Sequence, residues 1–248
     1  MNATKNVMSN GNGPTSLLAP CRIGVIGDFH GSSKRSALRL FLTEARPDAI
    51  LSVGDLQDYE DWPIPTYFIV GNHESFSTIR AIDAGTYVPR NLVHLRDAEV
   101  VVLAGLRVVG LGGIWEAPKG SPKAINRVAY DRLADETADI VITHETPIRF
   151  ANGHPDKTCE PIRTLCEVMA PRLWLSGHHH HYDSEHIGKT TILSLGKFPH
   201  EWATINVDSG GGIEVARFVP RDRAAYERQL PGWQQAARAQ MDSLNRED

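Results

Sequence analysis

The stretch RIGVIGDFH, residues 22–30, sets a short apolar run directly before a polar turn that carries an aspartate and a histidine. Arg22 to Gly27 has the continuous apolar character of a buried strand. A helix is expected after the turn, opened by Ser32 or Ser33. Its apolar side chains fall at i, i+3, i+4 and i+7, which places them on one face: Leu38, Phe41, Leu42 and Ala45. The segment therefore predicts a strand, a loop with polar groups, and a helix.

Similar apolar runs recur along the chain and predict further strands. Those at residues 49–53, 66–70, 139–143 and 173–175 are separated by helix-like segments, which favours buried, mostly parallel strands. Residues 99–103 and 106–111 flank Ala104–Gly105 as a hairpin. Strands are also expected at 192–195, 202–207 and 213–218, and helices at 123–136 and 159–170. Together these elements predict an α/β sandwich built on two sheets.

Five of the apolar runs end in side chains that can bind a metal ion. These are Asp28 with His30, then Asp55, Asn72, His144, and His178 with His180. In α/β sheets the carboxyl ends of the strands form the ligand crevice, so groups far apart in sequence can converge there. A glycine precedes Asp28, Asp55, Asn72 and His178, and it permits a tight turn out of each strand.

The chemistry of this set points to two metal ions. Two aspartates, one asparagine and four histidines make a mixed nitrogen and oxygen site without thiolate. Such a site suits Mn, Fe, Co, Ni or Zn, and we favour manganese. The set exceeds what one tetrahedral ion needs, and it fits two ions that share a bridging carboxylate. Two such ions can generate a hydroxide nucleophile and hold a phosphate during in-line displacement.

The ordered blocks resemble those of the calcineurin-like metallophosphoesterases. They are Asp28-x-His30, Gly54-Asp55, Gly71-Asn72-His73-Glu74, His144 and Gly177-His178-x-His180. The resemblance implies a double β-sandwich flanked by helices, with a dinuclear metal site at the sheet edge. It also implies a phosphoric ester hydrolase that uses a metal-activated hydroxide.

The resemblance assigns a role to each position. Asp28, His30, Asp55 and His180 would hold the first ion, and Asp55 would bridge to the second. The second ion would be completed by Asn72, His144 and His178. His73 would act as general acid at the leaving-group oxygen. Asp58 would orient His73, since a carboxylate on one imidazole nitrogen fixes the tautomer and supports the charged form.

Two residues that alternate with ligands, His179 and His181, are expected to face away from the metals on an extended segment. A shift of register by one residue would instead make them the ligands. Gly177 favours the first register.

The substrate is expected to be a small or nucleotide-type phosphodiester. Phosphoprotein phosphatases of this superfamily carry arginines where this chain has Tyr59-Glu60 and Val70, and those arginines grip phosphate dianions. A narrower resemblance to RNA lariat debranching enzymes runs through PTYFIVGNHES, NLVHL, LAGLRVVGLGGIW and DIVITHETP. Those enzymes often have Cys where Asp28 stands. A nucleotide or RNA end is therefore a candidate partner. A phosphomonoesterase and a non-catalytic metal-binding scaffold stay open as alternatives.

Composition supports one soluble domain. The chain has 248 residues, 41% of them apolar, and a net charge of −4, so bulk attraction to duplex nucleic acid or an anionic membrane is not expected. There are three cysteines without a CxxC pair, and no apolar run reaches membrane-spanning length. We expect a cytoplasmic protein with a disordered arm at 1–20, a catalytic domain at 21–220 and a helical tail at 221–248. The sequence leaves the oligomeric state open.

Overall fold

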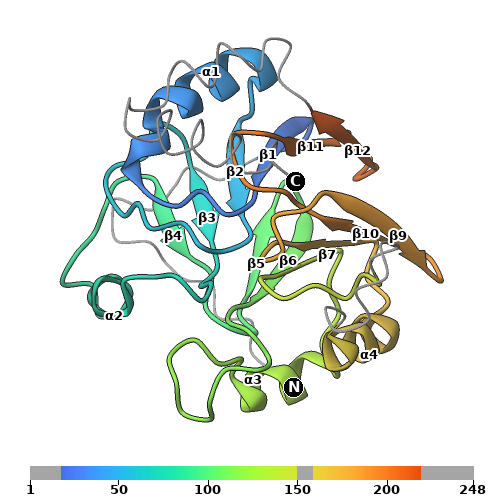
Figure 1. The fold of residues 1–248 in the computed structure, drawn as a ribbon. Coiled ribbons are helices and arrows are strands. Elements are labelled where there is room, and N and C mark those ends of the chain that lie inside the picture. The colour runs from blue at the N-terminus through green and yellow to red at the C-terminus, as the bar shows by residue number, and fades with distance from the viewer. Residues whose placement is uncertain (1–17, 150–158, 219–248) are drawn as a thin grey trace, which may run out of the picture.

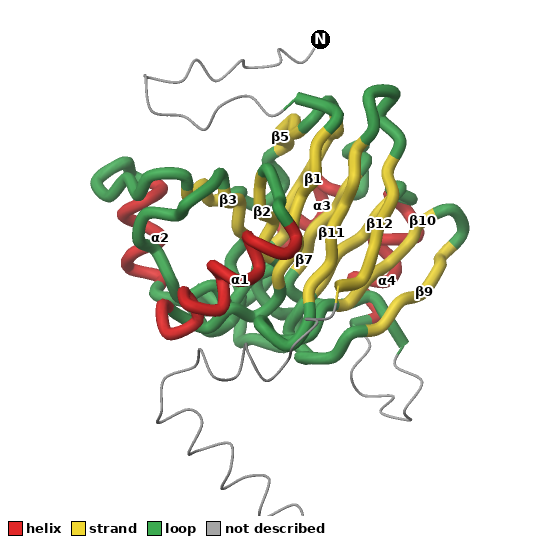
Figure 2. Tube along the Cα trace, turned by 90° about the horizontal axis from the view of Figure 1, so that it is seen from above, coloured by secondary structure: helices red, strands yellow, loops and turns green. Residues whose placement is uncertain are grey.

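The strands in the described part of the chain form two six-stranded mixed sheets that pack face to face (Figure 1). The computed structural model describes residues 18–149 and 159–218. The first sheet has the order β12-β11-β1-β2-β3-β4. Its strands are β1 (Cys21–Ile26), β2 (Ala49–Ser52), β3 (Thr66–Phe68), β4 (Leu92–His94), β11 (Trp202–Val207) and β12 (Ile213–Phe218). Strands β1 to β4 are parallel, and β11 and β12 add antiparallel partners at the β1 side (Figure 2).

The second sheet has the order β5-β6-β7-β8-β10-β9. It contains β5 (Val100–Leu103), β6 (Leu106–Leu111), β7 (Ile140–Thr143), β8 (Leu173–Ser176), β9 (Asp183–Ile187) and β10 (Thr190–Ser194). Strands β6, β7, β8 and β10 are parallel, and the predicted hairpin joins β5 to β6. The two-sheet α/β fold predicted from the sequence is confirmed.

The main core lies between the sheets. Ile23 and Val25 of β1 and Leu51 of β2 belong to one buried cluster with Ile140 and Ile142 of β7. Side chains alternate between the two faces of a strand. The apolar residues on the outer face of each sheet must therefore be buried by other elements. Because both faces of these strands are buried, their sequences are continuous apolar runs.

Helices cover the outer faces. Helix α1 (Arg35–Ala45) buries Leu38 and Phe41 against the outer face of the first sheet, where Trp202 also packs. Gly24 of β1 permits this approach, because a Cβ at Gly24 would lie 2.4 Å from Phe41 Cζ. Helices α3 (Arg127–Leu133) and α4 (Glu160–Met169) cover the outer face of the second sheet.

Several elements differ from the sequence expectations. A short 3₁₀ turn, η1 (Ser32–Lys34), precedes α1, so that neither Ser32 nor Ser33 is its cap. The predicted helix at 123–136 is shorter, because Asn126 caps α3 by accepting from the amides of Val128 and Ala129. Strand β4, strand β9 and helix α2 (Phe76–Asp83) were not predicted. Strand β4 has only three residues, β9 is polar, and α2 has only eight residues.

The expectations for the two ends concern residues outside those described. The arm at 1–20 overlaps the described part only at its last residues, and the tail at 221–248 lies wholly beyond it. Within the described ranges, the helices are too short or too polar to cross a bilayer.

Candidate dinuclear metal centre

The predicted ligands gather where the carboxyl ends of both sheets meet. Asp28 and His30 follow β1, Asp55 follows β2, and Asn72 follows β3, all in the first sheet. The second sheet contributes the remaining ligands, which are His144 after β7 and His178 and His180 after β8.

The loops that present these ligands have an unusual backbone. Five of the ligands have positive φ angles: Asp28 (38°), His30 (53°), Asp55 (50°), His178 (71°) and His180 (55°). Left-handed backbone is uncommon for residues other than glycine, and it clusters at functional sites. The fold therefore holds these side chains in place at a conformational cost.

A first ligand group consists of Asp28, His30 and His180, whose ligand atoms all lie within 4.8 Å of one another. His180 Nε2 is 3.3 Å from His30 Nε2 and 3.4 Å from Asp28 Oδ1. Ligands about 2.0–2.1 Å from a tetrahedral ion lie about 3.3–3.4 Å apart, so these spacings fit a shared cation. Asp28 Oδ1 is also buried and accepts no hydrogen bond from the described residues.

A second group forms around the buried imidazole of His144. Its Nε2 lies 2.9 Å from Asn72 Oδ1 and 3.6 Å from Asp55 Oδ1. Its Nδ1 donates to the carbonyl of Val53 at 2.8 Å, which leaves the Nε2 lone pair facing the oxygens of Asn72 and Asp55. Asp28 also belongs to this group, so its carboxylate lies between the two ligand sets.

Electrostatics favour the protonation states that metal ligands need. Burial alone would raise the pKa of Asp28, but the adjacent imidazoles of His180 and His144 outweigh burial and lower that pKa. Burial, reinforced by neighbouring His144, lowers the pKa of His178 to about 4. The carboxylate is thus ionised and the imidazole neutral at pH 7.

His178 sits beside the two groups rather than within them. Its backbone N–H donates to Asp28 Oδ2 at 3.2 Å, and its ring lies 5.1 Å from that of His144. Its ligand nitrogen instead falls within 4.8 Å of ligand atoms of Glu145 and His179. The structure therefore brings six of the seven predicted ligands into the two groups, with His178 adjacent.

His73 lies exposed at the edge of the centre. Its backbone N–H donates to Asp55 Oδ1 at 2.7 Å, and its ring lies edge-on to that of His30, 6.0 Å between centroids. The His73 side chain is therefore accessible to solvent beside the first ligand group.

Asp58 has a partner that sequence reasoning missed. Its two carboxylate oxygens accept from Arg35 Nε and Nη2 at 2.6 Å each. Among the described residues, no hydrogen bond joins Asp58 to His73. The orientation of His73 by Asp58 stays a prediction.

Glu74 was also missed as a residue that builds the site. Its carboxylate accepts from the amides of Leu56, Gln57 and Gly71 at 3.0–3.3 Å and from the Tyr59 hydroxyl. It thereby ties the loop after β2 to the loop after β3. Its position beside His73 in an otherwise polar loop was the signal that could have revealed it.

His179 belongs to neither of the two ligand groups, so its facing away from the metals stays a prediction, but the extended segment on which that prediction rested is not present. The positive φ angles of His178 and His180 break the extended conformation on which it rested. The His179 ring packs 4.6 Å from that of His178, and its Nε2 lies 3.4 Å from Glu145 Oε1. His181 is exposed.

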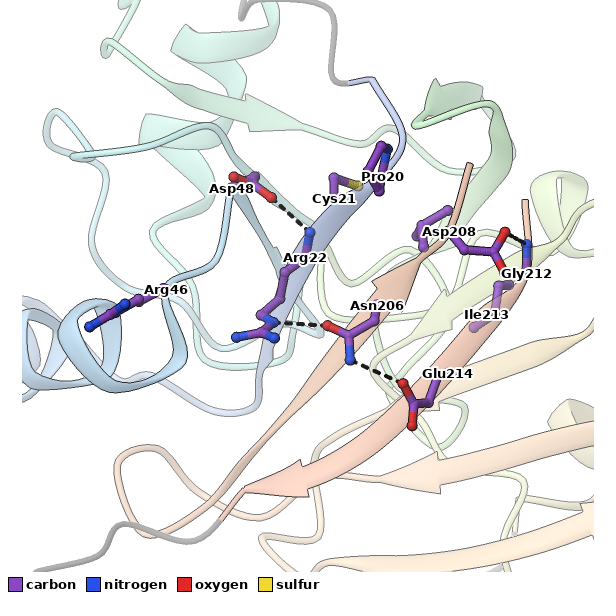
Figure 3. A pocket seen from close by; sticks show the side chains of 11 residues that line it. Pro20, Cys21, Arg22, Arg46, Asp48, Asn206, Asp208, Gly212, Ile213 and Glu214 are labelled. Carbon is purple, nitrogen blue, oxygen red and sulfur yellow. Dashed lines mark hydrogen bonds between the residues drawn. The ribbon is translucent and has the colours of Figure 1, made fainter. Parts of the chain in front are cut away.

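A cavity of about 550 Å³ lies at the other end of β1 (Figure 3). There Arg22 donates to Asn206 and Asp48, and Asn206 donates to Glu214. These polar groups pair with one another. The cavity opens beside Cys21, at the start of the strand whose far end carries Asp28, so it is separate from the metal centre.

The fold is a two-sheet α/β sandwich with two candidate groups of metal ligands where the carboxyl ends of its sheets meet. The family model of calcineurin-like phosphoesterases matches residues 21–182, and the chain belongs to this family. Membership implies divalent metal ions, and the two ligand groups fit them.

Curated relatives include lariat debranching enzymes. The one from Saccharomyces cerevisiae is 25% identical over 66% of this chain and 40% of its own length. The one from Entamoeba histolytica is 27% identical over 65% of this chain and 56% of its own, and the one from Mus musculus is 31% identical over 77% and 42%. The chain thus spans about half the length of these relatives.

Solved structures show the same fold at low identity. GAP50, described as the anchor in the inner membrane complex of Plasmodium, has a TM-score of 0.52 at 11% identity, covering 86% of this chain and 96% of that one. A putative 5′-nucleotidase from Staphylococcus aureus has a TM-score of 0.52 at 13% identity, covering 84% and 57%. These similarities concern the fold alone.

Proposed function

We propose that the protein is a dinuclear metal-dependent phosphoester hydrolase that prefers small or nucleotide-type phosphodiesters. The observation that carries the proposal is the convergence of two ligand groups, Asp28/His30/His180 and Asp55/Asn72/His144, from two sheets, the first of them at spacings that fit a shared cation. When bound, the ions would supply Lewis-acid polarisation of the phosphate and a hydroxide nucleophile at neutral pH.

The residues of the chain divide the remaining tasks. The Asp28 and Asp55 carboxylates would help to hold both ions. Asp28 belongs to both ligand groups, and Asp55, the expected bridging residue, lies 4.0 Å from His30 Nε2 and 3.6 Å from His144 Nε2. His73 would donate a proton to the leaving oxygen as the P–O bond breaks, because its exposed ring stands at the open edge of the centre.

The proposed preference for diesters is argued from cationic side chains, which bind the dianion of a phosphomonoester. Phosphoprotein phosphatases grip phosphate dianions with the arginine of an Arg-Gly pair and with a second arginine, and this chain has Tyr59-Glu60 and Val70 at those positions. The nearby guanidinium of Arg35 is held by Asp58. A phosphodiester carries one negative charge fewer than a phosphomonoester, so it needs fewer cationic side chains for binding. The names of the curated relatives support nucleic-acid diesters, including RNA ends, as candidate substrates.

Paired rates on bis-p-nitrophenyl phosphate and p-nitrophenyl phosphate test the proposal. The protein would be stripped of metal and reloaded separately with Mn²⁺, Fe²⁺, Co²⁺, Ni²⁺ or Zn²⁺, with bound metal counted in each sample. We expect faster turnover of the diester in metal-loaded protein and none in stripped protein, with Mn²⁺ as the favoured ion. A monoester preference would favour a phosphatase. Metal binding without turnover of either ester would favour a scaffold.

A further inference from the structure

The backbone around His73 is held by the loop that follows β2. The N–H of His73 donates to Asp55 Oδ1 at 2.7 Å. The two residues after His73 both contact the hydroxyl of Tyr59, which donates to the Glu74 carboxylate and accepts from the Ser75 N–H at 3.0 Å. Side chains of one neighbouring loop therefore fix the chain on both sides of the His73 side chain.

The position of the His73 ring depends on this backbone. Within the described ranges, no hydrogen bond reaches the His73 imidazole, and the Asp58 carboxylate is bound to Arg35. The exposed His73 ring meets that of His30 edge-on, with 6.0 Å between the centroids. A shift of the loop after β3 would therefore move the imidazole with it.

Tyr59 is itself firmly held. Its ring packs against the buried Phe68 of β3, with 6.1 Å between the centroids, and its carbonyl accepts from the Tyr87 hydroxyl at 2.8 Å. Burial and the adjacent Glu74 carboxylate raise the pKa of Tyr59, so its hydroxyl stays protonated and can donate. A phenol both donates and accepts, and both capacities are used here, toward Glu74 and Ser75. The Tyr59 hydroxyl is thus a fixed point for the loop after β3.

We propose that Tyr59 is a positioning residue, which holds His73 where it can protonate the leaving group. This inference rests on the proposed function, in which His73 is the general acid. Tyr59 acts through the Glu74 side chain and the Ser75 backbone, so it needs no contact with the substrate. Proton transfer requires the donor within hydrogen-bond reach of the leaving oxygen, and a displacement of about 1 Å can cost about 10²-fold in rate. The Tyr59 hydroxyl therefore affects the rate of the chemical step.

Tyr59→Phe tests the proposal, because it removes the hydroxyl and keeps the ring that packs on Phe68. Metal-loaded protein would be assayed on two diesters, one with an alkoxide leaving group and one with p-nitrophenolate, which departs without a proton. For the alkoxide we expect kcat to fall by about 10–100-fold with KM little changed, and for p-nitrophenolate a much smaller fall. Tyr87→Phe is the matched control. It removes a hydroxyl that donates to the backbone of the same loop, and it should keep both rates.

The double variant Tyr59→Phe/His73→Ala distinguishes positioning from general support of the centre. Without His73 there is no general acid to position, so Tyr59→Phe should cause no further loss in that background. A further loss of the same size, an equal loss on both esters, or fewer bound ions in Tyr59→Phe would overturn the proposal. Failure of the metal-loaded wild type to hydrolyse either diester would instead overturn the proposed function.

The position of the His73 ring can also be measured without turnover. In zinc-loaded protein with isotope-labelled histidine, the NMR signal of the His73 ring is identified by its loss in His73→Ala. We expect this signal to move toward that of free histidine or to broaden in Tyr59→Phe, and to stay unchanged in Tyr87→Phe. An unchanged His73 signal in folded Tyr59→Phe would show that the hydroxyl does not hold the ring, and it would overturn the proposal whatever the rates.

Discussion

Arg35 at the start of α1 holds Asp58, in the loop after β2, by two hydrogen bonds of 2.6 Å. The Asp58 side chain is fully buried, and that of Arg35 is 29% exposed. Arg35 also donates to the carbonyl of Asp61 at 2.8 Å. The pair thus fastens the outer helix to the loop that carries Asp55 and Tyr59.

Removing one partner of this pair should destabilise the fold. We expect Arg35→Ala to lower the free energy of unfolding by about 2–3 kcal/mol, because it leaves a buried carboxylate without its partner and Arg35 is partly screened by water. The double variant with Asp58→Asn should lose less than the sum of the single changes. Urea denaturation of the four proteins measures the coupling, and additive losses would argue against it.

The Asp58→Asn variant, compared with Arg35→Lys, tests whether Asp58 also positions His73. If it does, Asp58→Asn should change the pH profile of turnover for substrates with poor leaving groups, whereas Arg35→Lys should not. Equal pH profiles for Asp58→Asn and the wild type would restrict Asp58 to its structural role.

A methyl group at Gly54 should disturb the second ligand group. A Cβ there would lie 2.4 Å from His144 Nδ1, and Gly54 has a φ of +104°. We expect Gly54→Ala to displace His144 and to weaken binding of one ion by about 10–100-fold. Gly105→Ala is the matched control, because Gly105 also has positive φ (+81°) but no atom within 4 Å of the added Cβ. Isothermal titration with Mn²⁺ distinguishes the two, and equal losses of affinity would point to backbone strain alone.

His73→Ala should keep its metals and lose turnover. The His73 ring is exposed at the open edge of the centre, and a general acid contributes about 10²–10⁴-fold to rate. We expect a loss of this size for a diester with an alkoxide leaving group and a much smaller loss for p-nitrophenolate. The His181→Ala variant should match the wild type. Equal losses on both esters would contradict the role in protonating the leaving group.

Two of the cysteines should resist modification in the folded protein. Burial raises the pKa of both the Cys159 and the Cys166 thiol to about 12, so roughly 10⁻⁴ of each would be thiolate at pH 8. Cys21 is partly exposed. A disulfide reagent at pH 8 should therefore modify Cys21 first and reach the other two only on unfolding. Fast reaction in a Cys21→Ser variant would show that the buried thiols are accessible.

Those raised pKa values also predict a loss of stability in alkali. The unfolded thiols ionise near the ordinary value of 9.0, whereas Cys159 and Cys166 in the fold stay protonated up to about 12. Their contribution is fully present below pH 9 and is lost as pH rises from there toward 12. Urea midpoints at pH 8 and pH 10, compared between the wild type and Cys166→Ala, measure this difference. An equal shift in both proteins would exclude the contribution of Cys166.

Residues that follow buried strands could be predicted from sequence, because strand ends in both sheets converge on one edge. Asp28, Asp55 and His144 follow apolar runs that the buried sheets require. Arg35 gave no such signal, since its bond to Asp58 spans 23 residues and depends on how α1 packs. The expectation for His179 rested on alternation, which holds only in an extended chain, and residues 178 and 180 are not extended. Strand β9 was missed because DSEHI is a polar edge strand.

Each of the two ligand groups contains side chains from both sheets, so metal binding should affect the lifetime of the folded state. Ions bound by residues of both sheets would link the two sheets, which otherwise contact each other through apolar packing. Metal binding would then add to the free energy of folding. Chelation would then shorten the lifetime of the folded protein as well as abolish turnover. In a cell, the supply of transition metal would govern its abundance through proteolysis of the open form.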